Sequence, residues 1–170
     1  MTSSPFSAAP IELEAAGGVP ARLLPLDQRS CASLAAGIVA MEPWSVMNYP
    51  ADKLAAFLAS PDAGAARYAV SVKDKQSGVV SVRNPWLKGP YLELLALLPA
   101  AQNQGIGSSI MAWFESAGLK HGARNLWVCA SSFNARALRF YERHGFARAA
   151  TLPGLVADGY DEILLRKFPL

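Results

Sequence analysis

Two stretches in the C-terminal half of the chain have the hydrophobic pattern of buried strands. Residues 91–98, YLELLALL, are apolar at all but one position and end at Pro99. Residues 123–130 contain a second, shorter apolar run. Continuous apolar runs of this length are typical of strands that are covered on both faces. We therefore expect a buried strand in each stretch.

Helical periodicity follows both of these strands. Residues 105–119 carry apolar side chains at helical spacing, and a second helix is expected between Asn134, a suitable N-cap, and Gly145, a suitable residue after the last turn. Two further helices are expected over residues 27–40 and 51–60. The C-terminal half therefore alternates between strands and helices.

Shorter segments complete the predicted sheet. Further strands are expected at residues 11–14, 21–26, 68–72, 79–83, 148–152 and 162–167. The predicted fold class is α/β, a mixed, mostly antiparallel sheet of six or seven strands flanked by about four helices. Residues 11–170 are expected to form one domain, whereas residues 1–10, rich in Ser, Ala and Pro, are expected to be loose.

Composition narrows the classes of partner. The chain has 170 residues, 52% hydrophobic and 17% charged, with a net charge of +3 and no long basic run, which argues against nucleic acid. No apolar stretch reaches the roughly 18 residues of a membrane span, and the N-terminus lacks the pattern of a signal peptide. Cys31 and Cys129 lie too far apart in sequence to define a disulfide framework. We expect a cytoplasmic protein without a membrane partner.

The most informative motif is the loop QNQGIGS, residues 102–108, between the first buried strand and its helix. Unpaired N–H groups at a helix start bind anions, and glycines such as Gly105 and Gly107 let the main chain close around a phosphate. The loop lacks the Lys-Ser/Thr pair of nucleoside triphosphate loops and the Gly-x-Gly-x-x-Gly spacing of dinucleotide folds. It therefore predicts a different phosphate-bearing ligand.

The Gln-x-x-Gly-x-Gly pattern resembles the acyl-coenzyme A pyrophosphate loop of the GCN5-related N-acetyltransferases, the GNAT superfamily. A second motif at matching spacing carries the same resemblance: Asn134, Tyr141 and Gly145-Phe146. The resemblance covers about residues 20–168. It implies an enzyme that uses acetyl-CoA as cosubstrate and acetylates a primary amine of a small molecule or peptide by direct transfer in a ternary complex. Relatives often pair, so a homodimer is compatible with it.

The resemblance also implies where the cofactor lies. Backbone groups of Leu95 and Leu97 would bond the pantetheine arm, and Asn134 would combine a cap with a place at the cofactor. The residues that would surround the pyrophosphate are Gln102, Asn103, Gln104, Gly105, Ile106, Gly107 and Ser108. Family members often carry Arg or Lys in this loop, so here backbone amides are expected to supply nearly all the local anion binding. Three arginines on the second helix could reach the phosphate, but a solvated helix face explains them better: Arg136, Arg139 and Arg143.

Tyr141 is the expected catalytic acid. A phenol, with a pKa of about 10, is still protonated at neutral pH and can protonate the departing thiolate. The alternative is an aromatic side chain packed on the inner face of its helix. Its spacing from Asn134 and Gly145 favours the catalytic role.

The base is harder to place. Some relatives carry a Glu where this chain has Cys129, which we interpret as a small core residue rather than a nucleophile. Glu93 is the only charge in residues 91–98 and is the candidate base. The alternatives are a strand-end Glu that reaches solvent or an Arg, and an α-amine acceptor, with a pKa near 7.7–8.0, that needs no base.

Three loops are candidates for the acceptor site. Residues 41–49 and 84–90 are rich in aromatic side chains, and residues 152–162 end in three acids within five residues. Acids at a cleft mouth attract a cationic amine, although surface turns also collect acids. His121 and His144 do not form a metal-binding pattern, so no metal is expected.

A second functional class stays open, a non-catalytic acyl-CoA-binding regulatory or interaction module. The missing base at Cys129 and the uncharged loop favour it. The intact Tyr141 argues against it, because such a module has no use for an acid.

Overall fold

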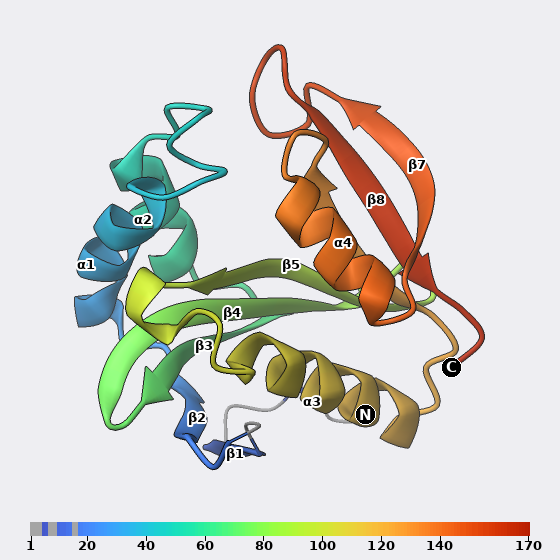
Figure 1. Ribbon diagram of the computed structural model, residues 1–170, viewed down its shortest axis with the longest axis horizontal. Coiled ribbons are helices and arrows are strands. Elements are labelled where there is room, and N and C mark those ends of the chain that lie inside the picture. Colours follow the sequence, from blue (N-terminus) through green and yellow to red (C-terminus); the bar gives the residue numbers. More distant parts are fainter. Residues whose placement is uncertain (1–4, 7–9, 15–16) are drawn as a thin grey trace.

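A single eight-stranded sheet runs through the part of the chain that the computed structural model describes, residues 5–6, 10–14 and 17–170 (Figure 1). Its strand order is β1-β2-β3-β4-β5-β6-β8-β7. The strands are β1 (Ile11–Glu14), β2 (Pro20–Pro25), β3 (Ala65–Val72), β4 (Lys75–Trp86), β5 (Gly89–Leu97), β6 (Leu126–Ser131), β7 (Ala147–Pro153) and β8 (Asp161–Lys167). Neighbouring strands are antiparallel except for β5 and β6, which are parallel. The predicted mixed, mostly antiparallel sheet is confirmed, with eight strands rather than six or seven.

Helices cover both faces of the central strands. The helices are α1 (Gln28–Val39), α2 (Ala51–Ala59), α3 (Ile106–Lys120) and α4 (Ala135–Arg143), and a short 3₁₀ turn, η1 (Pro99–Ala101), precedes the loop before α3. Val79 of β4 packs in a cluster with α1 and α2, whereas its neighbour Val80 packs in a cluster with α3. This alternation follows from the two-residue period of a strand. It explains why β4 and β5 have apolar residues at successive positions.

Local capping sets the ends of two predicted helices. The Asp27 side chain accepts a hydrogen bond from the Arg29 amide, which starts α1. The Asn134 side chain accepts one from the Ala137 amide at 3.1 Å, which starts α4. Gly145, just beyond α4, has a φ of +85° and ends it in the left-handed conformation. The caps predicted at Asn134 and Gly145 are confirmed.

The parallel strands β5 and β6 separate soon after they meet. Their pairing consists of Tyr91 with Trp127 and Leu92 with Val128. On the other edge of β5, Ser81 pairs with Leu94 and Val82 with Leu92, so Glu93 is an extra residue in a β-bulge. The bulge therefore coincides with the point where β5 leaves β6. Beyond the bulge, β5 and β6 diverge and are no longer paired.

The N-terminal segment is partly described. Phe6 is buried, and its ring centroid lies 5.5 Å from Trp113 and 5.8 Å from Phe114 on α3. The expectation of a loose segment over residues 1–10 stays a prediction, because residues 1–4 and 7–9 lie outside the described part. In the described residues, no helix is long and apolar enough to cross a membrane.

Candidate active site

The loop between β5 and α3 forms one end of a cavity of about 350 Å³. Asn103 and Gly105 have left-handed backbones, with φ of 60° and 76°. Gly105 is the N-cap of α3 and provides no side chain to cap it. The first N–H groups of a 15-residue helix are thus available to an anion in the cavity.

Most of the predicted loop residues line this cavity. Those that do are Gln102, Asn103, Gly105, Gly107 and Ser108. Two predicted residues turn their side chains elsewhere: Ile106 is buried in the core, and the Gln104 amide donates to the Ala100 carbonyl. Any part that these two play in anion binding is limited to their backbone.

Leu95 and Leu97 also line the cavity, as predicted. However, Gln102 Nε2 donates to the Leu97 carbonyl at 2.8 Å. An incoming amide would have to displace this side chain to use that carbonyl. The prediction for Leu95 is unaffected.

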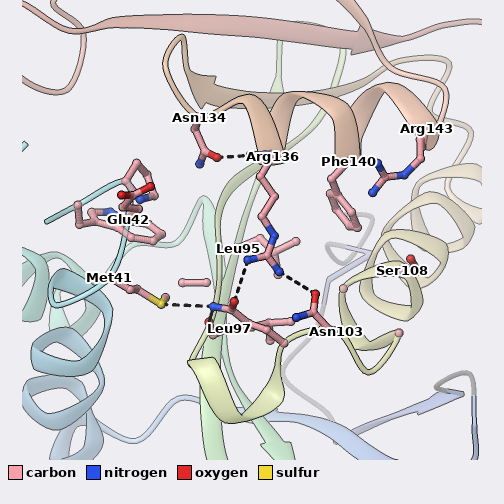
Figure 2. A pocket seen from close by; sticks show the side chains of 17 residues that line it. Met41, Glu42, Leu95, Leu97, Asn103, Ser108, Asn134, Arg136, Phe140 and Arg143 are labelled. Carbon is pink, nitrogen blue, oxygen red and sulfur yellow. Dashed lines mark hydrogen bonds between the residues drawn. The ribbon is translucent and has the colours of Figure 1, made fainter. Parts of the chain in front are cut away.

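Arg136 supplies the positive charge that the loop itself lacks. Its Nη1 donates to Gln102 Oε1 at 3.0 Å and its Nη2 to Asn103 Oδ1 at 2.9 Å. Figure 2 shows the side chain descending from α4 onto the loop, with Phe140 and Arg143 beside it. The expectation that backbone amides supply nearly all the local anion binding stays a prediction, but a cation does lie on the loop. The uncharged amides of the loop hold a guanidinium from another helix.

The three arginines of α4 differ in their surroundings. Arg136 and Arg143 line the cavity with Phe140, at the i, i+4, i+7 spacing of one helix face. Arg139 is exposed and is absent from the cavity lining. All three arginines are exposed, as a solvated face requires, and Arg136 and Arg143 line the cavity in addition.

Gly107 allows α4 to pack closely over the loop. A Cβ atom at this position would lie 3.3 Å from the Phe140 ring, closer than most such contacts. A residue without a side chain therefore lets α4 and the loop approach, which brings Arg136 within reach.

A second cavity, of about 150 Å³, adjoins the first where β5 and β6 separate. The residues that line both cavities are Pro43, Trp44, Leu95, Asn134 and Ala137. The polar and titratable residues that line the second cavity are Tyr91, Glu93, Cys129, Ser131, Asn134, Tyr141 and Glu162. The structure therefore brings both predicted catalytic residues, Tyr141 and Glu93, to one small space.

Tyr141 is both a packed ring and a cavity residue. It is buried, and its ring lies near Phe140 and Phe146, at centroid distances of 5.4 and 6.1 Å. Burial raises the pKa of its phenol above the usual value. The two alternatives from the sequence are thus compatible, and the phenol stays protonated at neutral pH.

Glu93 is held in an ion-pair network. Its Oε2 accepts from Ser81 Oγ at 2.6 Å, and its Oε1 accepts from Arg83 Nε at 3.1 Å. Arg83 also donates to Asp62 at 2.6 Å. The alternative of a Glu that reaches an Arg is the observed one. Since both carboxylate oxygens already have donors, the geometry does not favour Glu93 as the base.

Glu162, at the start of β8, is the site residue that the sequence did not single out. It is 5% exposed, and Ser131 Oγ donates to its Oε1. Burial raises its pKa, although hydrogen bonds from Ser131 and Cys129 act in the opposite direction. The sequence indicated only an acidic turn. The register that pairs Glu162 with Ser131 depends on β8 lying beside β6, which no local pattern reveals.

Cys129 has the character of an inert thiol. Burial, with a contribution from the Glu162 charge, raises its pKa to about 12. A thiol in this state is not a nucleophile at neutral pH. The interpretation of Cys129 as non-nucleophilic agrees with this setting, although it is only partly buried and lines the cavity.

Two of the three candidate loops wall the second cavity. Pro43, Trp44 and Met47 come from the α1–α2 connection, and Leu155 and Val156 from the β7–β8 loop. Tyr160 Oη donates to the Val46 carbonyl at 3.1 Å and joins the two loops.

The third candidate loop, residues 84–90, contacts a residue that lines the second cavity but does not line the cavity itself. Its Trp86 stacks on Tyr91 at 4.6 Å. Of the three acids predicted at the mouth, Glu162 lines the cavity, whereas Asp158 and Asp161 do not. Among the described residues, no three His, Cys, Asp or Glu side chains cluster in a way that could hold a metal.

The sequence model of the acetyltransferase (GNAT) family matches residues 34–146, about two thirds of the chain. The chain therefore belongs to the GNAT acetyltransferase family, and the predicted family is confirmed. Membership implies acetyl transfer that depends on acyl-CoA, and the glycine loop, Asn134 and Tyr141 all lie within the matched region. A comparison with curated proteins gave no match.

Solved structures show the same fold. A probable GNAT-family acetyltransferase from Chromobacterium violaceum superposes with a TM-score of 0.75 at 21% identity, covering 95% of this chain and 87% of that one. Mycobacterium smegmatis RimJ in complex with CoA-disulfide gives 0.68 at 13% identity, covering 95% and 88%. The ribosomal-protein-S18-alanine N-acetyltransferase from Escherichia coli gives 0.66 at 17% identity, covering 88% and 94%. At these identities the likeness concerns the fold.

The contacts of Arg136 generate a test of the cofactor site. We expect Arg136→Ala to weaken CoA binding roughly 10- to 100-fold, because a charge-assisted hydrogen bond contributes about 1.5–3 kcal/mol. The matched control is Arg139→Ala, which removes the same charge from the same helix outside the cavity. Isothermal titration calorimetry with CoA measures both, and equal affinities for the two variants would contradict this role.

Proposed function

We propose that this protein is an acetyl-CoA-dependent N-acetyltransferase that moves an acetyl group directly to a primary amine of a small molecule or peptide in a ternary complex. The observation that carries the proposal is the junction of the two cavities at the separation of β5 and β6. Both are lined by Pro43, Trp44, Leu95, Asn134 and Ala137. A thioester that approaches from one side and an amine from the other would meet there.

The larger cavity suits the phosphate-bearing part of CoA. It combines the start of α3, the left-handed backbone at Asn103 and Gly105, and the guanidinium groups of Arg136 and Arg143. Backbone N–H groups and arginines are the usual donors to phosphate in proteins. CoA would supply the activated acetyl group as a thioester.

Transfer moves one proton from nitrogen to sulfur while an N–C bond forms and a C–S bond breaks. The departing thiolate needs a donor, and Tyr141 is a buried phenol that lines the smaller cavity. Because burial raises its pKa, the phenol keeps its proton through the physiological range and remains available to donate it. We assign Tyr141 as the general acid.

The proton leaving nitrogen needs an acceptor, and we assign this role to Glu162 in place of Glu93. Glu162 lines the same cavity as Tyr141 and is bound by the Ser131 and Cys129 side chains. A carboxylate with a raised pKa is a stronger base than an ordinary one. Glu93 is bound by the Arg83 guanidinium and Ser81, which leaves it less available.

The alternative of a non-catalytic acyl-CoA-binding module loses its two supports. The uncharged loop is complemented by Arg136, and the absent carboxylate at Cys129 has a counterpart in Glu162, one strand away. Both observations favour the enzyme.

Replacing Tyr141 tests the acid. We expect Tyr141→Phe to lower kcat roughly 100-fold, since general acid catalysis contributes about 10²–10⁴-fold, while the Kd for acetyl-CoA changes less than about twofold. A thiol-release assay and calorimetry measure the two quantities. Tyr49→Phe, on the α1–α2 connection outside both cavity linings, is the control. Unchanged kcat in Tyr141→Phe would remove this residue from the mechanism.

The pH dependence tests the base. Glu162 acts only when deprotonated, and its pKa lies above the ordinary 4.5, so the rate falls as the pH drops through that raised value. In the wild type, the acidic limb of the pH profile of kcat/KM should therefore show two ionisations, that of the acceptor amine and that of Glu162. Glu162→Gln, which can keep the Ser131 hydrogen bond, should lose that ionisation and roughly 100-fold in rate.

The matched variant is Glu93→Gln. It should keep this second ionisation, because Glu93 is held by Arg83 and Ser81 rather than free to accept a proton. If the ionisation disappears in Glu93→Gln and persists in Glu162→Gln, the base assignment is reversed.

A further inference from the structure

The chemistry of the smaller cavity restricts the class of amine that fits, an inference that rests on the proposed function. We propose that the acceptor is a primary amine carried on one small apolar group, with no carboxylate beside the nitrogen. A free arylalkyl or branched alkyl amine has this chemistry, and so does the first residue of a peptide whose carboxyl group is in an amide bond. Free amino acids and polyamines do not.

The charges around the cavity exclude a carboxylate. Glu93 and Glu162 line it, and no Lys, Arg or His is present among its described lining residues. The guanidinium next to it, that of Arg83, is bound by Glu93 at 3.1 Å and by Asp62 at 2.6 Å. A second carboxylate would thus be desolvated beside Glu162 without a cation to pair with. Like charges in such a site are strongly disfavoured.

The arginines of the cofactor side do not change this conclusion. Arg136 and Arg143 line the larger cavity and are absent from the smaller one. Arg136 is also fixed on the loop by Gln102 and Asn103. Its charge therefore lies at the glycine loop in the larger cavity, and not in the smaller one.

The side chains that the two loops contribute to the cavity are apolar. Pro43, Trp44 and Met47 face it from the α1–α2 connection, and Leu155 and Val156 from the β7–β8 loop. Leu155 is 57% exposed and Val156 38%. Apolar side chains left partly exposed at the mouth of a cavity gain from covering an apolar ligand. These apolar side chains provide no hydrogen bonds or charges to a hydrophilic chain.

The size of the cavity limits the apolar group. A cavity of about 150 Å³ is small beside the roughly 300–1,000 Å³ of drug-sized sites. Apolar cavities of about 150 Å³ hold one benzene-sized ring. A polycation has no apolar group to fill this space, and only one of its charges could pair with Glu162, the cavity carboxylate that has no arginine partner.

An acceptor panel tests the proposal at fixed acetyl-CoA. It contains 2-phenylethylamine, L-phenylalaninamide, L-phenylalanine and spermidine, read as kcat/KM for thiol release with product mass to confirm N-acetylation. We expect both carboxylate-free aromatic amines to exceed L-phenylalanine by at least about 100-fold, and spermidine by a similar factor. Comparable kcat/KM for L-phenylalanine, or a preference for spermidine, would overturn the inference while leaving the enzyme assignment intact. 2-Phenylethylamine stands for a free amine, and L-phenylalaninamide, whose carboxyl group is an amide, stands for a peptide N-terminus. The ratio of their kcat/KM values therefore distinguishes the two sources.

A charge introduced at the mouth gives a second test. Val156→Lys places a cation on an exposed position of the wall and should raise kcat/KM for L-phenylalanine relative to 2-phenylethylamine at least about tenfold. The control is Val46→Lys, an equally exposed valine on the facing loop that does not line the cavity. An unchanged ratio in Val156→Lys, or the same change in both variants, would contradict the proposal.

Binding separates this inference from the proposed function. Calorimetric titration of the same amines into the protein–CoA complex should give the same ranking. If no amine releases thiol but the ranking holds, the enzyme assignment fails and the acceptor chemistry stands. If neither turnover nor binding follows the ranking, the inference about the acceptor fails, whether or not the protein is an enzyme.

Discussion

The separation of two parallel strands is the constraint on which the site depends. β5 and β6 pair at Leu92 and Val128, and the bulge at Glu93 carries β5 away immediately afterwards. A regular sheet would place neighbouring strands about 4.8 Å apart and leave no space between them. The bulge leaves side chains from β5, β6, α4 and β8 facing one cavity. It also turns Glu93 toward Arg83 and Ser81, which stabilise its charge in place.

The second organising interaction is the contact between α4 and the glycine loop. The loop supplies shape and the helix supplies charge, because Gln102 and Asn103 accept hydrogen bonds from Arg136. The positive charge comes from a residue 33 positions away from Asn103, and the missing side chain of Gly107 leaves room for the Phe140 ring of the same helix. This arrangement couples the order of the loop to the docking of α4. A change that loosens α4 should therefore affect both the phosphate end and Tyr141.

Local signals were enough to predict much of this molecule. The apolar run over residues 91–98, the caps at Asn134 and Gly145 and the glycine pattern of residues 102–108 each depend on neighbours in sequence, and each led to the correct element. The residues that were missed or misjudged depend on contacts between distant segments. Glu162 is buried because β8 lies next to β6, and Arg136 reaches the loop because α4 packs over it. Hydrophobic periodicity says where a helix turns its apolar face, but it does not say which partner an arginine meets.

The hydrogen bond from Tyr160 to Val46 spans 114 positions of the chain and joins two loops that contribute neither to the glycine loop nor to α4. Of these two loops, the β7–β8 loop lines only the smaller cavity, through Leu155 and Val156, whereas Pro43 and Trp44 of the α1–α2 connection line both cavities. Loops tolerate replacement far better than the strands and helices that carry them. New acceptors could therefore evolve by exchanging residues 154–160 alone, with the transfer machinery inherited unaltered.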